Sequence, residues 1–185
     1  VSMMEELALH ILDIVENSVK GGASRVDLRI TEDDRADRME LEISDDGRGI
    51  PPALVETIFD PFVTTRTERR VGLGLSFFRQ AAQACDGDVT LTSVPGEGTR
   101  VLAVFGLSHP DRQPMGDLGT TVATLLAGTT GVRIIMTLGT ARGDFVLDSR
   151  DLCAELGDDC FHDGMVLNFV AEMINEKRRD LGAAS

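Results

Sequence analysis

The spacing of apolar positions changes several times along the first half of the chain, and each change predicts a different element. Residues 5–20 are apolar around most of a helix circumference, which predicts a buried helix that ends at Gly21 and Gly22. Strict alternation of apolar and polar side chains follows in residues 25–31 and 40–44. This alternation is typical of two half-buried strands, and the acidic stretch between them predicts a hairpin loop.

More elements follow a glycine-containing turn at residues 45–49. The prolines after this turn predict a short helix over residues 52–58, because proline favours the first helical position. A helical pattern over residues 76–84 precedes two strands, at residues 88–93 and 99–106, around a glycine-rich turn. Helices beside a mixed sheet predict an α/β sandwich, in which helices cover one face of the sheet.

The pattern breaks at residues 108–116, where two prolines and the lack of any periodicity predict a linker. We therefore expect one domain over residues 1–107 and a small α+β extension over residues 117–185. In the extension, Asp117 predicts the start of a helix because its side chain can accept a hydrogen bond from the helix backbone. A hairpin, a short helix from Asp148 or Ser149 and a final helix from about Asp163 are expected to follow it.

Charge and composition narrow the classes of partner. The chain has 31 acidic and 18 basic side chains, a net charge of −13, which repels nucleic acid and anionic membrane surfaces. No apolar run approaches the roughly 20 residues that cross a bilayer, and the first residues lack the basic segment of a signal peptide, so the cytoplasm is the expected compartment. Three cysteines without CxxC spacing argue against a disulfide framework and a zinc knuckle. Ordinary burial of these thiols is favoured over a metal site shared by Cys153, Cys160 and His162.

A line of polar side chains interrupts the apolar first helix. His10, Asp13 and Asn17 stand at i, i+3 and i+7, so they share one face of the helix. Burying a carboxylate and an amide without hydrogen bonds costs a few kcal/mol, so this face needs a cleft, a ligand or a metal. Asn17 offers an oxygen suited to Mg²⁺, and Asp13 could accept a proton. A structural polar network is the alternative.

Two glycine-containing segments are candidate ligand sites. Asp45 ends a strand and can accept a hydrogen bond from an exocyclic amine, while Gly47 and Gly49 let the backbone approach a ligand closely. Residues 72–75 lie at the start of a helix, where backbone N–H groups and the helix dipole attract anions. The dense basic cluster just before them could reach phosphates: Arg66, Arg69 and Arg70. A tight turn and a solvated charged loop are the alternatives.

The order and spacing of these segments resemble the conserved boxes of the GHKL ATPases, the Bergerat-fold superfamily, and in particular the ATP-binding domain of histidine kinases. The resemblance covers roughly residues 5–107. Residues 12–18 with 22–24 are similar to the N box, and residues 45–50 to the G1 box. The F box and the G2 box correspond to residues 58–65 and 72–76, and the turn at 95–99 is similar to the final hairpin of the kinase domain.

The resemblance implies specific roles in binding ATP. Asn17 would bind Mg²⁺ and Asp45 would accept the adenine amino group, in a pocket shaped by Gly47 and Gly49. Asp13 stands where relatives carry a general-base glutamate or an asparagine, and it is shorter than glutamate by one methylene. Residues 64–71 would form a lid over ATP, and further ATP contacts are implied for Ile50, Phe62, Arg66, Gly72, Leu73, Gly74, Leu75 and Thr99.

Two classes of function follow from this resemblance. The first is a stand-alone kinase-type module that transfers the γ-phosphate of ATP to a separate protein. Histidine autophosphorylation is not expected, because only nine residues precede His10 and an acceptor helix would have to precede the N box. The alternative is a nucleotide-dependent regulatory or assembly module with slow or no hydrolysis. In this module bound ATP would order the lid, which would present Arg66, Arg69 and Arg70 to a partner, and residues 117–185 would serve as a docking or dimerisation element. A MutL-like DNA clamp is disfavoured by the acidity of the chain.

Overall fold

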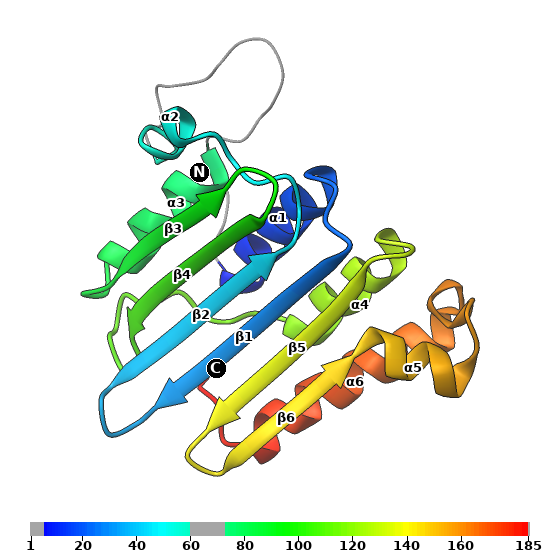
Figure 1. Cartoon of the computed structure of the whole chain (residues 1–185). Coiled ribbons are helices and arrows are strands. Elements are labelled where there is room, and N and C mark those ends of the chain that lie inside the picture. Colours follow the sequence, from blue (N-terminus) through cyan, green and yellow to red (C-terminus); the bar gives the residue numbers. More distant parts are fainter. Residues whose placement is uncertain (1–5, 60–72, 185) are drawn as a thin grey trace.

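A single mixed sheet organises the chain, in a computed structural model that describes residues 6–59 and 73–184 (Figure 1). Its strands lie in the order β3-β4-β2-β1-β5-β6. β1 and β5 run parallel, and every other neighbouring pair is antiparallel. The strands are β1 (Arg25–Asp33), β2 (Arg38–Asp45), β3 (Asp88–Val94), β4 (Gly98–Gly106), β5 (Arg133–Thr140) and β6 (Gly143–Asp148).

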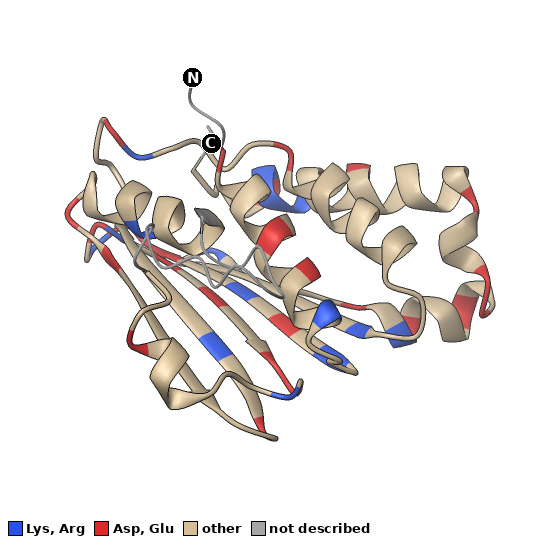
Figure 2. Cartoon of the chain, turned by 90° about the horizontal axis from the view of Figure 1, so that it is seen from above, with Lys and Arg blue, Asp and Glu red and all other residues tan. Residues whose placement is uncertain are grey.

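The long helices cover one face of this sheet, as Figures 1 and 2 show from two directions. They are α1 (Leu7–Lys20), α3 (Leu73–Gln83), α4 (Leu118–Gly128) and α6 (Gly164–Asp180). The described part of the chain also has three short helices: α2 (Pro52–Val55), α5 (Ser149–Leu156) and the 3₁₀ helix η1 (Cys160–His162). Every second residue of β1 is buried, as alternation predicts for a strand covered on one side. The predicted α/β sandwich with a C-terminal α+β extension is confirmed.

The C-terminal extension continues the sheet and the core of the first hundred residues. β5 pairs with β1, so that Leu28 lies beside Met136. Residues 108–116 run between the two parts, and the carbonyl groups of Pro114 and Met115 accept hydrogen bonds from the first N–H groups of α1. Met115 is fully buried. One cluster of buried apolar side chains therefore includes residues from both sides of this segment.

The three helix starts predicted in the extension are confirmed by their caps. Asp117 accepts a hydrogen bond from the Thr120 amide at 2.9 Å, and Asp163 accepts one from the Met165 amide at 2.8 Å. Asp148 caps α5 in the same way. Each carboxylate satisfies an N–H group that has no partner within its own helix, and its charge is favourable at that end of the helix dipole.

Two helix boundaries in the first part differ from the sequence prediction. The helix expected over residues 52–58 ends at Val55, because the N–H groups of Thr57 and Ile58 bond to carbonyls three residues back and form turns. The helix expected from residue 76 begins at Leu73. Gly74 lies in its first turn, where a Cβ atom would come within 1.9 Å of the Asp13 carboxylate. The glycine thus lets the helix begin against α1.

Charged residues of both signs are scattered over the surface. In the view of Figure 2, Lys and Arg do not gather into one patch. On the uncovered face of the sheet, Arg100 donates two hydrogen bonds to Glu42, at 2.8 and 2.9 Å. None of the helices in the described ranges is long and apolar enough to cross a membrane.

Candidate functional site

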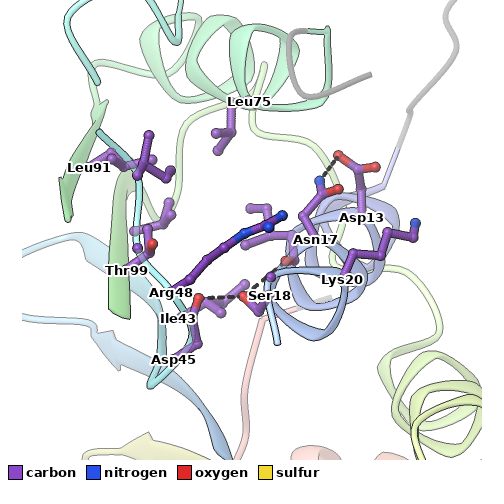
Figure 3. Close-up of a pocket in the computed structure, with 15 residues that line it drawn as sticks. Asp13, Asn17, Ser18, Lys20, Ile43, Asp45, Arg48, Leu75, Leu91 and Thr99 are labelled. Atoms are coloured by element: carbon purple, nitrogen blue, oxygen red, sulfur yellow. Dashed lines mark hydrogen bonds between the residues drawn. The ribbon is translucent and has the colours of Figure 1, made fainter. Parts of the chain in front are cut away.

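A cavity of about 350 Å³ lies between α1, the start of α3 and the ends of β2, β3 and β4 (Figure 3). Its volume falls in the range of small-molecule sites, about 300–1,000 Å³. Most of its wall is apolar, and a few polar groups converge on it, as is usual for a ligand site. The lining residues are Asp13, Ile14, Asn17, Ser18, Lys20, Gly21, Ile43, Asp45, Arg48, Gly49, Ile50, Leu75, Leu91, Thr99 and Val101.

Asp45 supplies a fixed hydrogen-bond acceptor to the cavity wall. It is the last residue of β2 and pairs with Thr99 of β4. Its Oδ2 accepts a hydrogen bond from the Ser18 hydroxyl at 2.6 Å, and its Oδ1 accepts one from the Gly47 amide at 2.9 Å. Each carboxylate oxygen has a second lone pair, so Asp45 can still accept a bond from a ligand amine.

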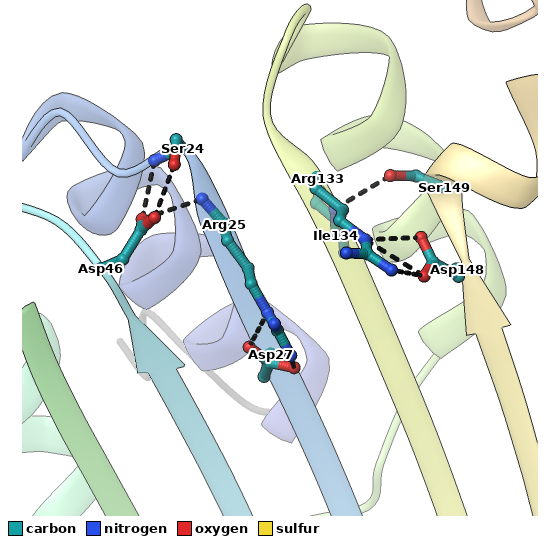
Figure 4. A network of polar contacts seen from close by, with 8 residues as sticks. All are labelled: Ser24, Arg25, Asp27, Asp46, Arg133, Ile134, Asp148 and Ser149. Carbon is teal, nitrogen blue, oxygen red and sulfur yellow. Dashed lines mark hydrogen bonds and ion pairs between the residues drawn. The ribbon is translucent and has the colours of Figure 1, made fainter.

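Asp46 holds the turn that follows Asp45 (Figure 4). Its carboxylate accepts hydrogen bonds from the backbone N–H groups of Ser24 and Arg25, at 2.7 and 2.8 Å, and from the Ser24 hydroxyl. The Ser24 hydroxyl, with these amides, lowers the pKa of Asp46. Neighbouring aspartates thus have different tasks, because Asp46 ties the turn to the start of β1 while Asp45 lines the cavity.

Close contacts surround the two glycines of this turn. Gly49 has a φ of +68°, and a Cβ atom there would lie 2.2 Å from the carbonyl oxygen of Val94. At Gly47, a Cβ atom would meet Asp45 Oδ1 at 3.0 Å and the carbonyl oxygen of Gly21 at 3.2 Å. Only glycine fits both the conformation and the space at position 49. The turn is therefore packed tightly between α1 and the β3–β4 hairpin.

Asp13 and Asn17 bring the polar face of α1 to the cavity. Asn17 Nδ2 donates a hydrogen bond to Asp13 Oδ2 at 3.4 Å. Because the nitrogen faces Asp13, Oδ1 is the atom of Asn17 that can ligate a cation, and amide oxygens suit Mg²⁺. Burial raises the pKa of Asp13, while the positive charge of Lys20 opposes this rise. The residues present therefore fit a hard cation beside a carboxylate.

His10, one turn before Asp13, takes no part in this cavity. It is fully buried, its Nε2 lies 3.2 Å from the Gln113 side-chain oxygen, and its ring packs on Phe78 with the ring centroids 4.9 Å apart. Burial lowers the pKa of His10, which favours the neutral ring. The polar line predicted along α1 thus divides into a core histidine and a pair that faces the cavity.

Most of the residues predicted to contact ATP meet at this cavity. Seven of them line it: Asp13, Asn17, Asp45, Gly49, Ile50, Leu75 and Thr99. Gly47 and Gly74 border it through their contacts with Asp45 and Asp13. Leu73 is the first residue of α3. Phe62, Arg66 and Gly72, with the expected lid over residues 64–71, lie outside the described residues.

Three polar lining residues were not predicted from the sequence. Ser18 lines the cavity and holds Asp45, and Lys20 and Arg48 add positive charge to the wall. The helical spacing carried a usable signal for Lys20, because it stands at i+3 from Asn17 and shares its face. The hydrogen bond of Ser18 to Asp45 joins residues 27 positions apart and could be found only in the fold.

The fold and the cavity together define a class of protein, an α/β sandwich with a small-molecule-sized site between a helix and the ends of strands. The family model for histidine kinase-, DNA gyrase B- and HSP90-like ATPases matches residues 5–109. The chain belongs to this family. It therefore carries an ATP-binding domain of the kind found in sensor histidine kinases.

Curated relatives are similar over the same part of the chain. The sensor histidine kinase YxdK of Bacillus subtilis is 35% identical over 106 residues, covering 54% of this chain and 32% of that protein. The signal transduction histidine-protein kinase AtoS of Escherichia coli is 32% identical over 104 residues, covering 56% of this chain and 17% of that protein. The chain thus spans a third or less of the length of these relatives.

A solved structure of the N-terminal domain of a DNA repair protein has a similar fold, with a TM-score of 0.56 and 18% identity. The match covers 84% of this chain and 58% of that one, so it reaches beyond the residues that the family model matches. At this identity the likeness concerns the fold alone.

Proposed function

We propose that the chain binds Mg²⁺-ATP in this cavity and transfers the γ-phosphate to a side chain of a separate protein. The convergence of Asp45, Asn17 and Asp13 on one cavity, in a domain of the ATPase family, carries the proposal. The two curated relatives described above are kinases by name, which favours phosphoryl transfer over other uses of ATP. The net charge of −13 disfavours nucleic acid and anionic membrane surfaces as partners, and the proposed compartment for this activity is the cytoplasm.

Adenine would lie against the wall formed by β2 and β4. Asp45 would accept a hydrogen bond from its amino group, and this contact would favour adenine over guanine, which has a carbonyl oxygen at the corresponding position. Gly47, Gly49 and Ile50 would shape this part of the pocket, with Thr99 on the neighbouring strand. Because the Asp45 carboxylate is already held by Ser18 and by the backbone, it needs little reorganisation on binding.

The phosphates would lie toward α1 and the start of α3. Asn17 would hold a Mg²⁺ ion, which neutralises charge on the phosphate oxygens. The side chains of Lys20 and Arg48 line the same cavity and add positive charge. Gly74 and its neighbours Gly72, Leu73 and Leu75 would contribute backbone N–H groups at the helix start, where anions are favoured. Phe62 and Arg66, which lie outside the described residues, are also proposed as ATP contacts.

Asp13 is proposed as the general base that accepts the proton of the acceptor side chain. Burial raises its pKa, which strengthens it as a base. Its hydrogen bond with Asn17 supports this role, because Asp13 would then lie beside the proposed Mg²⁺ ion. Incubation with radiolabelled ATP and proteins encoded by neighbouring genes should label one of them. The label should be lost with Asp13→Asn, and a complete absence of label on every acceptor would contradict the transfer.

A second candidate function is a nucleotide-dependent assembly module with slow or no hydrolysis. It is favoured by two large apolar side chains on the outer face of α6, Met165 at 77% exposure and Phe169 at 59%. Such side chains are typical of protein contacts, including a homodimer. Light scattering with and without Mg²⁺-ATP would support this function if the mass changed. An unchanged mass, together with labelling of a separate protein, would favour the kinase.

A further inference from the structure

Two cysteines that lie apart in the sequence come together in the C-terminal extension. Cys153 is in the last turn of α5 and Cys160 is the first residue of η1. Their Sγ atoms are 3.6 Å apart, and both are free thiols. The third cysteine, Cys85, is buried just after the end of α3, and its thiol donates to carbonyl groups of that helix. The extension therefore contains a dithiol pair, and Cys85 is a thiol in a different environment.

A second cavity, of about 240 Å³, opens beside this pair. Its wall includes Cys153, Phe161 and His162, whereas Cys160 is 6% exposed and does not line it. Two arginines also line the cavity. Arg133 is held in an ion pair with Asp148 (Figure 4), whereas none of the ion pairs among the described residues includes Arg150. A small molecule that enters this cavity would thus meet Cys153 first and Cys160 behind it.

The local geometry allows these sulfurs to bond. A disulfide has a sulfur–sulfur distance of about 2.05 Å, so the two atoms need to approach by about 1.5 Å. The segment between the cysteines includes Gly157, at the end of α5 with a φ of +100°, followed by a turn into η1. Neither cysteine belongs to a group of three or more metal-ligating side chains among the described residues. The pair therefore suits thiol–disulfide chemistry better than a metal site.

We propose that Cys153 and Cys160 form a reversible intramolecular disulfide by exchange with a low-molecular-weight disulfide that enters the second cavity. The Cys153 thiolate attacks one sulfur of the small disulfide, so that a mixed disulfide forms and one small thiolate leaves. The Cys160 thiolate then attacks Cys153 Sγ, which forms the Cys153–Cys160 bond and releases the second small thiolate. The two cysteines lose two electrons and two protons, and the small disulfide is reduced to two thiols.

The protonation of Cys153 sets the pace of the first step of this exchange. Burial, together with the neighbouring Cys160, raises the pKa of Cys153 to about 11. Cys153 is thus a thiol at neutral pH, and because the thiolate is the attacking species, exchange is slow. The disulfide is then expected to follow sustained oxidation over hours instead of a brief pulse of oxidant.

Peptide mapping after oxidation of the whole chain tests this proposal. The folded protein is incubated for hours in mixtures of oxidised and reduced glutathione, alkylated and cleaved with trypsin. Both cysteines of the pair lie in the single tryptic peptide 151–177, and Cys85 lies in peptide 80–100. The expected result is that peptide 151–177 loses two hydrogen masses and both alkylation sites together, and regains them with a reductant. Cys85 should remain alkylatable once the chain is unfolded.

Serine variants test the order of the two steps. Cys160→Ser is expected to accumulate a mixed disulfide with glutathione at Cys153, because the resolving thiol is missing. Cys153→Ser should leave Cys160 free, since Cys160 does not line the cavity. Cys85→Ser is the matched control, and it should form the disulfide as the wild type does.

Several results would overturn the proposal. One is that both thiols of the folded chain stay free under conditions in which the urea-unfolded chain forms the disulfide. A stable mixed disulfide in the wild type, or a crosslink between chains, would also exclude it. The second cavity shares no lining residue with the first, so ATP affinity should be the same before and after oxidation. The outcome is therefore independent of the function proposed above.

Discussion

The substitution Asp45→Asn tests how the cavity would recognise adenine. In the wild type, Ser18 and the Gly47 amide donate to opposite oxygens of the Asp45 carboxylate. Asparagine keeps one oxygen and places an NH₂ group at the other position. The asparagine can stay in place with its oxygen toward the Gly47 amide. The Ser18 hydroxyl can then donate its proton to the Ile14 carbonyl and accept a hydrogen bond from the new NH₂ group. The fold should survive, but a donor would then face the adenine amino group.

The expected loss can be worked out from the hydrogen bond that the ligand forfeits. A hydrogen bond to a charged group contributes about 1.5–3 kcal/mol. Since about 1.4 kcal/mol corresponds to a tenfold change, Asp45→Asn should weaken ATP binding by about 10- to 150-fold. Isothermal titration calorimetry with Mg²⁺-ATP measures this ratio directly.

The matched control is the same substitution one residue later, Asp46→Asn. Asp46 supports the turn from outside the cavity, so its loss should lower stability by about 1 kcal/mol, or about 2–4 °C in Tm, and leave ATP affinity within about threefold. The two variants are thus expected to separate binding from stability. Equal ATP affinities for Asp45→Asn and the wild type would refute the role assigned to Asp45.

Three further predictions concern packing, pH and turnover. Gly119→Ala should destabilise the protein by about 1–3 kcal/mol in urea unfolding, because its Cβ would lie 2.1 Å from the Ala171 carbonyl oxygen. Gly128→Ala places its methyl group in open space and should not destabilise the protein. If the two variants lost the same free energy of unfolding, the tight contact between α4 and α6 at Gly119 would be contradicted. Burial raises the pKa of Glu32 in the folded state, so the folded chain binds this proton more tightly than the unfolded chain does. The free energy of unfolding that this difference adds is complete at low pH and is lost as the pH rises through the folded-state pKa. The Tm of Glu32→Gln should therefore rise relative to that of the wild type as the pH increases above about 4, the ordinary pKa of glutamate, and a difference that stays constant with pH would disprove this. Asp13→Asn should keep ATP affinity and lose phosphate transfer, and unchanged transfer would exclude it as the base.

Local patterns were enough to predict the first part of the fold. Alternation along β1 and β2 and the apolar circumference of α1 depend on neighbours in sequence, and the structure has these elements where they were expected. The helix starts at Asp117 and Asp163 were predictable for the same reason, since a cap acts within one turn. The ends of α2 and α3 were not, because they depend on turns and on the contact of Gly74 with Asp13.

Long-range pairing was beyond the reach of the sequence. Nothing in residues 132–138 indicates that β5 lies parallel to β1. Parallel strands are joined by a long crossover instead of a tight turn, so no local turn pattern in the sequence indicates which strands pair. The candidate site was predictable where a motif supplied it, as at Asn17 and Asp45. The role of Ser18 was not, since its hydrogen bond to Asp45 appears only when α1 and β2 are side by side. The same applies to the sulfurs of Cys153 and Cys160, whose spacing fits no familiar pattern.

Calorimetric titration of the whole chain with Mg²⁺-ATP tests the central claim most directly. We predict saturable binding of one ATP per chain, weaker binding when Mg²⁺ is removed or Asn17 is replaced by alanine, and much weaker binding of Mg²⁺-GTP. The absence of any binding heat with ATP, confirmed by an unchanged Tm at saturating nucleotide, would contradict the assignment of this cavity as a nucleotide site.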